Sequence, residues 1–237
     1  MTHPGGHPAD EPGPMAFVSD LEVPVLAESD AHHLVRVLRR RAGDPMTVSD
    51  GLGRWRTARL GLSPPASLGS LGPVRELIDA APAISIGFAL VKGDKPELIV
   101  QKLTELGIDR IVPFRADRSV VRWDDAKGAK AVERLRSVAR SAAMQCHRPH
   151  LPVVSDVQDL GGLVAAGAAM ADRGGASPSL AMPFVLVGPE GGWSEEEASQ
   201  PAPRVALGVH VLRAETAAVA AGVILTSLRV GIVTPKV

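Results

Sequence analysis

Two patterns of hydrophobic and polar residues divide the chain near residue 80. Upstream, apolar and polar residues alternate on both sides of the turn Gly51–Gly53, so residues 45–50 and 54–60 are expected to form a β-hairpin. Downstream, apolar strands alternate with amphipathic helices. The expected strands are 83–91, 110–114, 167–172, 183–187 and 204–207, and the expected helices are 94–106, 124–146, 155–163 and one that begins near residue 215. This alternation predicts an α/β fold with a mostly parallel sheet.

A further helix is expected in the N-terminal part, because residues 34, 35 and 38 form one apolar stripe and Asp30 is placed as an N-cap. Glycine and proline cluster at residues 61–82, which marks a break in composition. We therefore expect a flexible tail at 1–16, a small β domain at 17–80 and an α/β domain at 81–237.

Composition narrows the class of protein. At 237 residues the chain is long enough for one large domain or two modest ones. Its single cysteine, Cys146, excludes an internal disulfide and indicates a reducing compartment. The first 15 residues lack the apolar stretch of a signal peptide, and polar residues interrupt the apolar run 217–233, so no membrane role is expected.

Charge is balanced over the whole chain but unevenly distributed along it. The net charge is zero, yet residues 32–59 hold seven arginines against two acids, and residues 115–148 hold nine Lys and Arg against four acids. Two basic segments can form a face that binds a polyanion. The alternative is that these charges are scattered over the surface and solvated.

Two glycine-containing loops follow the last two expected strands and lie close together in the sequence. Each leads from a strand into a helix, and glycine lets main-chain N–H and C=O groups approach a ligand closely. The pattern predicts a cofactor pocket made largely of main chain. Its expected residues are Val187, Gly188, Pro189, Glu190, Gly191 and Gly192 in the first loop and Leu207, Gly208 and Leu212 in the second. For Glu190 the alternative is a bond to the backbone instead of the cofactor. The alternative is that these glycines only form turns, since residues 194–197 also have the pattern of a helix capping box.

Other cofactor and metal motifs are missing from the sequence. No G-x-G-x-x-G follows the first strand of a βαβ unit, and no Gly-Lys-Ser/Thr of a P-loop occurs. One cysteine and seven scattered histidines do not provide the spacing of zinc ligands. We therefore expect no dinucleotide site, no P-loop and no bound metal.

Four segments, taken in order, carry a resemblance to a known family. They are 33–39 with 43–44 and 50–53; 92–95 with 105–107 and 118–121; Gly188-Pro-Glu-Gly-Gly192; and 207–208 with Leu212-Arg-Ala-Glu-Thr-Ala217. In these segments the chain resembles the bacterial 16S ribosomal RNA uridine-N3 methyltransferases of the SPOUT superfamily, which use S-adenosylmethionine. The four segments together are more specific than any one of them, and they span residues 32–217.

The resemblance implies a fold, a cofactor and partners. It implies a PUA-like RNA-binding β-barrel at 17–80 and a SPOUT methyltransferase domain with a C-terminal trefoil knot at 81–237. It implies S-adenosyl-L-methionine as the cofactor, held by the two glycine loops, and 16S rRNA, free or in the 30S subunit, as the substrate. It also implies a cytoplasmic homodimer, since SPOUT active sites lie at a two-fold interface.

Methylation of uridine N3 needs a group that accepts the imide proton and a cation or N–H donors near the uracil oxygens. Arg213 and Glu215 directly follow the second loop. We assign Arg213 to stabilising the uracil oxygens and Glu215 to accepting the proton or orienting the base. The alternative for Glu215 is a helix cap, because a carboxylate suits the positive end of a helix dipole.

RNA contacts are expected from basic residues, since arginine binds phosphate through a planar fork. The candidates are Arg36, Arg39 and Arg40 at the first helix, Lys92 and Lys95 at a strand end, and Arg118 and Arg148. For each one the alternative is a solvated surface charge. Because Tyr is absent and the three Trp are dispersed, recognition should rest on phosphate contacts and shape, with the target base flipped out.

The chain departs from the family pattern in three places. Residues 144–148 are Met-Gln-Cys-His-Arg where the family usually has Glu-Gln-Ser-Gly-Arg, residues 207–210 are Leu-Gly-Val-His instead of Leu-Gly-Pro-Arg, and Ala214 replaces a common threonine. These departures leave two other functions open. One is a non-catalytic RNA-binding homologue, and the other is a SPOUT methyltransferase with another RNA target.

Overall fold

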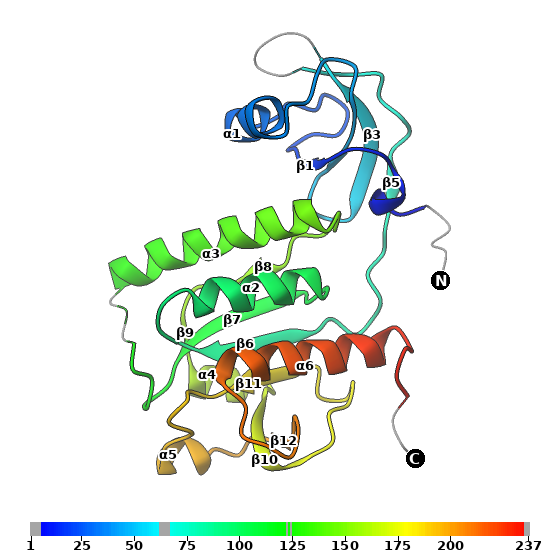
Figure 1. The fold of residues 1–237 in the computed structure, drawn as a ribbon. Helices are drawn as coiled ribbons and strands as arrows, with labels where there is room; N and C mark the ends of the chain where they lie inside the picture. The colour runs from blue at the N-terminus through cyan, green and yellow to red at the C-terminus, as the bar shows by residue number, and fades with distance from the viewer. Residues whose placement is uncertain (1–5, 62–66, 122, 124, 235–237) are drawn as a thin grey trace. The chain divides into compact units, whose positions relative to one another are not determined.

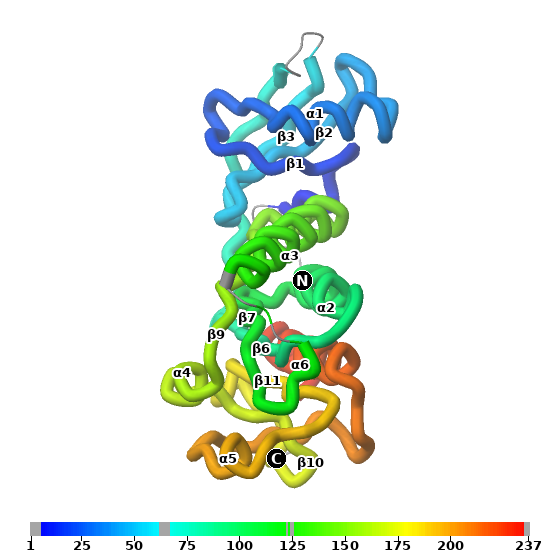
Figure 2. Tube along the Cα trace, turned by 90° about the vertical axis from the view of Figure 1, so that its left-hand side faces the viewer, coloured from blue at the N-terminus to red at the C-terminus, as the bar shows by residue number. Residues whose placement is uncertain are grey.

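The computed structural model describes residues 6–61, 67–121, 123 and 125–234, and the chain forms two compact units. Unit 1 comprises residues 1–79 and 140–151, and unit 2 comprises residues 80–139 and 152–237. Figures 1 and 2 trace the chain through both units. Three parts of the expectations lie outside the described residues: positions 1–5 of the tail, 62–66 of the Gly- and Pro-rich break, and Asp124 at the start of the long helix.

Residues 6–16 are packed in unit 1, although the sequence predicted a flexible tail there. Residues Pro8–Asp10 form a 3-10 turn, and Glu11 pairs with Arg75 at 2.7 Å. Strand β1 (Met15–Phe17) is fully buried and pairs in parallel with β2 (Pro45–Ser49). Burial of these apolar side chains holds the segment in place.

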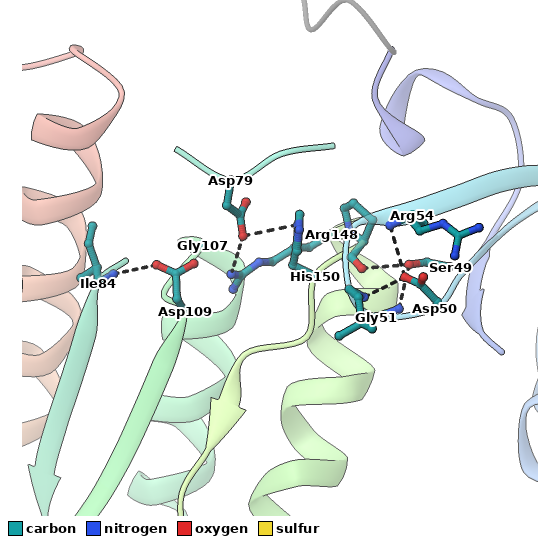
Figure 3. Close-up of polar contacts among 12 residues, drawn as sticks. Ser49, Asp50, Gly51, Arg54, Asp79, Ile84, Gly107, Asp109, Arg148 and His150 are labelled. Carbon is teal, nitrogen blue, oxygen red and sulfur yellow. Dashed lines mark hydrogen bonds and ion pairs between the residues drawn. The ribbon is translucent and has the colours of Figure 1, made fainter. Parts of the chain in front are cut away.

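The hairpin predicted for unit 1 is confirmed. Strands β2 and β3 (Arg54–Leu60) are antiparallel, and β4 (Leu68–Gly69) and β5 (Arg75–Glu76) both pair with β3. Gly51 and Gly53 have φ values of 79° and 101°, a region that favours glycine. The Oδ1 atom of Asp50 accepts the main-chain N–H groups of Leu52 and Arg54 at 2.8 and 3.2 Å, which closes the turn (Figure 3).

The first helix differs from its prediction. It consists of α1 (Glu28–His32) followed by one π turn, η2 (His33–Val37), and its N-cap is Ala27. Asp30, expected as the N-cap, lies inside α1, where it is buried and accepts hydrogen bonds of 2.9 and 2.7 Å from Arg140. Of the expected apolar stripe only Leu34 is buried. The π turn widens the helix and turns residues 35 and 38 toward solvent.

Unit 2 contains the expected parallel sheet. Its strand order is β12-β10-β11-β6-β7-β8, with β9 also paired to β7, and every pair is parallel. The strands are β6 (Ser85–Ala89), β7 (Arg110–Arg115), β8 (Val153–Val154), β9 (Gln158–Asp159), β10 (Ala169–Ala176), β11 (Phe184–Val187) and β12 (Arg204–Val205). The five strands predicted for this region are confirmed.

Helices cover both faces of this sheet (Figure 1). On one face, apolar side chains of β6 and β11 pack against α2 (Lys95–Glu105), α6 (Ala214–Arg229) and residues 135–139 of α3 (Asp125–Gln145). On the other face, α4 (Leu160–Ala165) and the segment around α5 (Glu195–Ala198) cover β7, β10 and β11. One detail of the helix predictions is wrong: α4 begins at Leu160, after the short strand β9, and not at residue 155.

The C-terminal end of α6 is bound at the amino ends of β6 and β7, whereas the first glycine loop follows the carboxyl end of β11. Asp109, just before β7, accepts the main-chain N–H of Ile84 at 2.7 Å (Figure 3). It also accepts a short hydrogen bond from Arg229. Arg229 also donates to the carbonyl of Gly107 at 2.7 Å. These bonds fix the C-terminal end of α6, whose N-cap and first turn carry the candidate catalytic residues. Within the described ranges, no helix combines the length and apolar character needed to cross a membrane.

Candidate functional site

The first glycine loop continues directly from strand β11 and is held tightly. Its turn is closed by a hydrogen bond from Gly192 N–H to the carbonyl of Pro189 at 2.9 Å. Gly188 lies against the indole of Trp193, and a Cβ at this position would lie 2.9 Å from that ring. Trp193 itself stacks on Phe114, with centroids 6.1 Å apart, and donates its N–H to the carbonyl of Ala171 at 3.0 Å. Glycine is therefore required at 188 by close packing.

The loop leads into α5 through the capping box that the sequence predicted. Ser194 is the N-cap and accepts the N–H of Glu197, whose buried carboxylate accepts the N–H of Ser194 in return. The same carboxylate accepts the main-chain N–H of Asp117 at 2.8 Å. The capping box therefore also links α5 to the loop after β7. This link fixes the chain directly after the first glycine loop.

The second loop, residues 206–213, runs from β12 to α6. Leu207 and Leu212 pack partly buried against the core of the sheet. Between them, Val209 and Val211 are 84% and 76% exposed. Among the residues that the structure describes, none forms a hydrogen bond with residues 207–212. This loop is therefore fixed at its two ends and open in the middle.

A cavity of about 390 Å³ lies between the two loops. Seven of the nine predicted cofactor residues line it: Val187, Gly188, Pro189, Gly192, Leu207, Gly208 and Leu212. Glu190 and Gly191 do not line it. The size falls within the range of ligand pockets, which is roughly 300–1,000 Å³. The two loops thus form one pocket, as their spacing in the sequence predicted.

Three charged side chains meet beside this pocket. Lys95, the first residue of α2, makes a short hydrogen bond with Glu190 of the first loop, and its Nζ lies 3.6 Å from Oε2 of Glu215 in the first turn of α6. The hydrogen bond to Glu190 raises the pKa of Lys95 above its ordinary value. The pKa of Glu190 is lowered, chiefly by the hydrogen bond from Lys95 and further by the nearby charges of Arg213 and Lys92.

Arg213 and Glu215 both lie next to this pocket, at the start of α6. Arg213 is the N-cap of the helix, is exposed, and stands between the lining residues Leu212 and Ala214. The side chain of Glu215 is 16% exposed, and its Oε2 is buried without a hydrogen-bond donor. That oxygen therefore does not cap the helix, and it keeps unused capacity to accept a hydrogen bond.

Comparison with known proteins decides the family. A model of the RNA methyltransferase domain matches residues 79–226, and one of the RNA methyltransferase PUA domain matches residues 26–62. Ribosomal RNA small subunit methyltransferase E of Mycobacterium bovis is 33% identical over 228 residues, covering 84% of each chain. The protein of that name from Bacillus subtilis is 32% identical over 213 residues, covering 79% of this chain and 83% of the relative. The chain belongs to the ribosomal RNA small subunit methyltransferase E family.

A solved structure supports this assignment. Ribosomal RNA small subunit methyltransferase E of Neisseria gonorrhoeae, bound to S-adenosyl methionine, matches with a TM-score of 0.78 and 26% identity, covering 91% of this chain and 97% of that chain. The matches confirm the resemblance found in the four sequence segments, together with the α/β fold and the PUA domain.

The RNA-contact candidates of unit 2 occupy different environments in this methyltransferase E family member. Lys92 is exposed after β6. Arg118 is exposed after β7 and donates a hydrogen bond of 3.2 Å to the carbonyl of Gly191, so it supports the first loop. Lys95 is ion-paired with two carboxylates, those of Glu190 and Glu215. Arg122, a further basic residue of this region, lies outside the described residues.

The candidates of unit 1 also divide. Arg36 and Arg39 are exposed, and Arg40 is half-buried. Arg148, in contrast, is 8% exposed and lies 3.7 Å from the carboxylate of Asp79, which also faces His150 at 3.3 Å (Figure 3). The placement of Arg148 corrects the expectation of a phosphate contact, because a buried guanidinium paired with a carboxylate cannot reach RNA.

Part of the pocket wall comes from residues that the sequence did not predict. Asp172, Arg173 and His210 also line the cavity. Asp172 and Arg173 follow the first residues of β10, whose parallel neighbour β11 leads into the first loop. Because ligands of parallel sheets bind outside the carboxyl ends of the strands, the expected end of this strand at Asp172 was a usable signal.

A larger cavity, of about 640 Å³, lies beside α5 and is lined there by Glu196 and Glu197 of the helix and by Gln200, which follows it. Carboxylates dominate its charged lining, with Asp117 and Asp159 joining the two glutamates against Arg115. It contains neither glycine loop and neither candidate catalytic residue. The smaller cavity is therefore the candidate site, because main-chain groups of both loops and the residues next to Arg213 line it.

Proposed function

We propose that this protein transfers a methyl group from S-adenosyl-L-methionine to N3 of a uridine in 16S ribosomal RNA of the small subunit. The observation that carries the proposal is the single pocket formed by the two glycine loops, with Arg213 and Glu215 at its edge. Membership of the methyltransferase E family supports the reaction, and the cofactor bound in the relative from Neisseria gonorrhoeae supports the choice of methyl donor.

The pocket suits S-adenosylmethionine in size and in chemistry. Main-chain groups of both loops would hold the cofactor, and Leu207, Leu212 and Trp193 give apolar surface for its adenine and its methylene groups. Asp172 offers a carboxylate to polar hydrogens of the ligand. When bound, the cofactor supplies an electrophilic methyl group on a sulfonium.

Arg213 and Glu215 would act on the uracil. The exposed guanidinium of Arg213 would stabilise negative charge on the uracil oxygens as the N3 proton leaves. The carboxylate of Glu215 would accept that proton or orient the ring through its polar edge. The buried Oε2 of Glu215 accepts no hydrogen bond within the described residues, which supports a role for this carboxylate beyond helix capping.

Basic residues that are exposed or half-buried would bind the RNA backbone. Arg36, Arg39 and Arg40 of unit 1 and Lys92 and Arg118 of unit 2 remain the candidates for phosphate contacts. We also propose the cytoplasmic homodimer and the trefoil knot that the family resemblance implies. The exposed apolar side chains of Val209 and Val211 support an interface next to the pocket.

The test is methyl transfer followed by nucleoside analysis. The purified protein is incubated with labelled S-adenosylmethionine and either unmodified 16S rRNA or 30S subunits, and the digested RNA is analysed by mass spectrometry. We expect label in 3-methyluridine. Cofactor-independent RNA binding with no label in either substrate would identify a non-catalytic homologue, and label in another nucleoside or another RNA would identify a different target.

A further inference from the structure

Lysine is unfavourable at position 95, because this position is the first residue of a helix. Lys95 is the first residue of α2, followed by Pro96, and the N-cap Asp94 makes no side-chain hydrogen bond to the helix. The N-terminal end of a helix carries partial positive charge, so a lysine there is repelled. A residue that breaks a local rule in a stable fold usually has a tertiary reason.

The tertiary reason is a pair of carboxylates from two other elements. Glu190 comes from the loop after β11, and Glu215 comes from the first turn of α6. Both are ion-paired with the ammonium group of Lys95, through a short hydrogen bond to Glu190 and a 3.6 Å contact to Glu215. The start of α2, the first cofactor loop and the catalytic helix therefore meet at one charged group of unit 2.

We propose that Lys95 is a positioning residue, which holds the first cofactor loop through Glu190 and the carboxylate of Glu215 through the same ammonium group. The role rests on the proposed function, since it gives Glu215 its orientation for methyl transfer. It replaces the phosphate contact predicted from the sequence. An ammonium group that already faces two carboxylates has little attraction left for an RNA phosphate.

The surroundings of the two carboxylates explain why the lysine matters more for Glu215. Glu190 is half exposed and also feels the charges of Arg213 and Lys92, so it keeps other stabilising partners without Lys95. Glu215 is 16% exposed, and within the described residues Lys95 is the cation paired with its buried Oε2. Removal of one partner of a largely buried pair leaves the other charge uncompensated, and the carboxylate then changes its orientation.

The first test is Lys95→Met, which keeps the length of the side chain and removes the charge. We expect kcat for methyl transfer to fall about 10- to 100-fold, the size of effect that a misplaced catalytic group produces. RNA affinity should stay within about twofold of the wild type, and its salt dependence should not change. The loss of one phosphate contact would weaken RNA binding more than this and would lower the salt slope. Lys95→Arg should restore most of kcat. Lys102→Met is the matched control, because Lys102 lies on the same helix in a surface pair with Glu105 and should leave kcat unchanged.

A double-mutant cycle with Glu215→Gln separates positioning from an independent effect. If Lys95 acts through Glu215, Lys95→Met should lower kcat by less than about threefold when Glu215→Gln is already present. Equal losses in both backgrounds would overturn the proposal. Weaker RNA binding with a smaller salt slope and an unchanged kcat would also overturn it and restore the phosphate contact.

A structural readout keeps this proposal distinct from the proposed function. Crystal structures of the wild type and of Lys95→Met should show the Glu215 carboxylate in different positions. If the wild type transfers no methyl group, the proposed function fails, while movement of Glu215 still supports the positioning role. An unmoved Glu215 in the variant overturns that role whatever the activity.

Discussion

The two loops of the pocket are built in different ways. The first is held at several points: Gly188 packs on Trp193, Arg118 donates to the carbonyl of Gly191, and Lys95 binds Glu190. The second is fixed by two leucines at its ends, and its middle is exposed and makes no hydrogen bond within the described chain. One wall of the pocket is therefore held by contacts along its length, and the other is held only at its two ends.

This difference suggests separate roles for the two loops in cofactor binding and in turnover. A preformed loop loses little conformational entropy on binding, so the first loop is suited to provide affinity. The second loop ends in Arg213 and leads directly to Glu215, so its position decides where the proposed catalytic groups stand. Substitutions in the first loop should mainly change cofactor affinity, and those at the end of the second should mainly change turnover.

The largest expected effect is that of Arg213→Ala on turnover. Loss of a group that stabilises developing charge costs roughly 100-fold or more in kcat. The dissociation constant for S-adenosylmethionine should stay within about twofold, because such a group acts on the transition state more than on cofactor binding. Calorimetry and single-turnover kinetics measure the two quantities separately. Equal losses in both would move Arg213 from the chemistry to the pocket wall.

Gly188→Ala should weaken cofactor binding strongly. The added Cβ would lie 2.9 Å from the indole of Trp193, which is stacked and hydrogen-bonded and cannot move away freely. Overpacking of this kind costs about 1–3 kcal/mol, which corresponds to about 5- to 150-fold in affinity if the strain falls on the bound form. Gly162→Ala in α4 is the control, because a Cβ there meets no atom within 4 Å. Unchanged affinity would show that the first loop is only a turn.

Arg118→Ala should have a smaller effect on the same quantity. It removes the hydrogen bond of 3.2 Å to the carbonyl of Gly191, and one exposed hydrogen bond contributes about 0.5–1.5 kcal/mol. We expect affinity for S-adenosylmethionine to fall about two- to tenfold by calorimetry. Arg115→Ala, on the same segment but paired with Asp159 instead, should leave affinity unchanged. If the two variants behave alike, the first loop is not held by Arg118.

The smallest expected effect is a gain from Val209→Pro in the second loop. The main chain at 209 makes no hydrogen bond within the described residues, so proline removes none. A proline at a compatible position restricts the free chain and contributes about 0.4–1 kcal/mol. Cofactor affinity should rise about two- to fivefold. Unchanged affinity would mean that the free loop already has the bound shape, and the contrast between the loops would then disappear.

The sequence predicted those parts of the molecule that depend on local patterns. The hairpin followed from alternation around Gly51 and Gly53, and the parallel strands followed from apolar runs between amphipathic helices. The capping box at Ser194 and the pairing of two glycine loops also followed from neighbouring residues. Seven lining residues of the pocket could be named because both loops lie within 26 positions of each other, from 187 to 212.

The parts that could not be predicted depend on contacts between distant residues. The sequence predicted Asp30 as an N-cap, but its carboxylate binds Arg140, which lies 110 positions away. Arg148 looked like a surface charge, but it is buried beside Asp79. Lys95 and Glu190 are 95 positions apart, so their pairing left no local trace except an unfavourable lysine at a helix start.

The most direct test of the central claim is a crystal structure of the protein with S-adenosylmethionine bound. We predict that the cofactor occupies the cavity between residues 187–192 and 207–212, with main-chain contacts from both loops and its methyl group facing Arg213 and Glu215. A shift of residues 207–212 toward the ligand, with residues 187–192 unmoved, would support the proposed difference between the two loops. A cofactor bound in the larger cavity beside Asp117 and Glu196, or in contact with only one loop, would contradict the account.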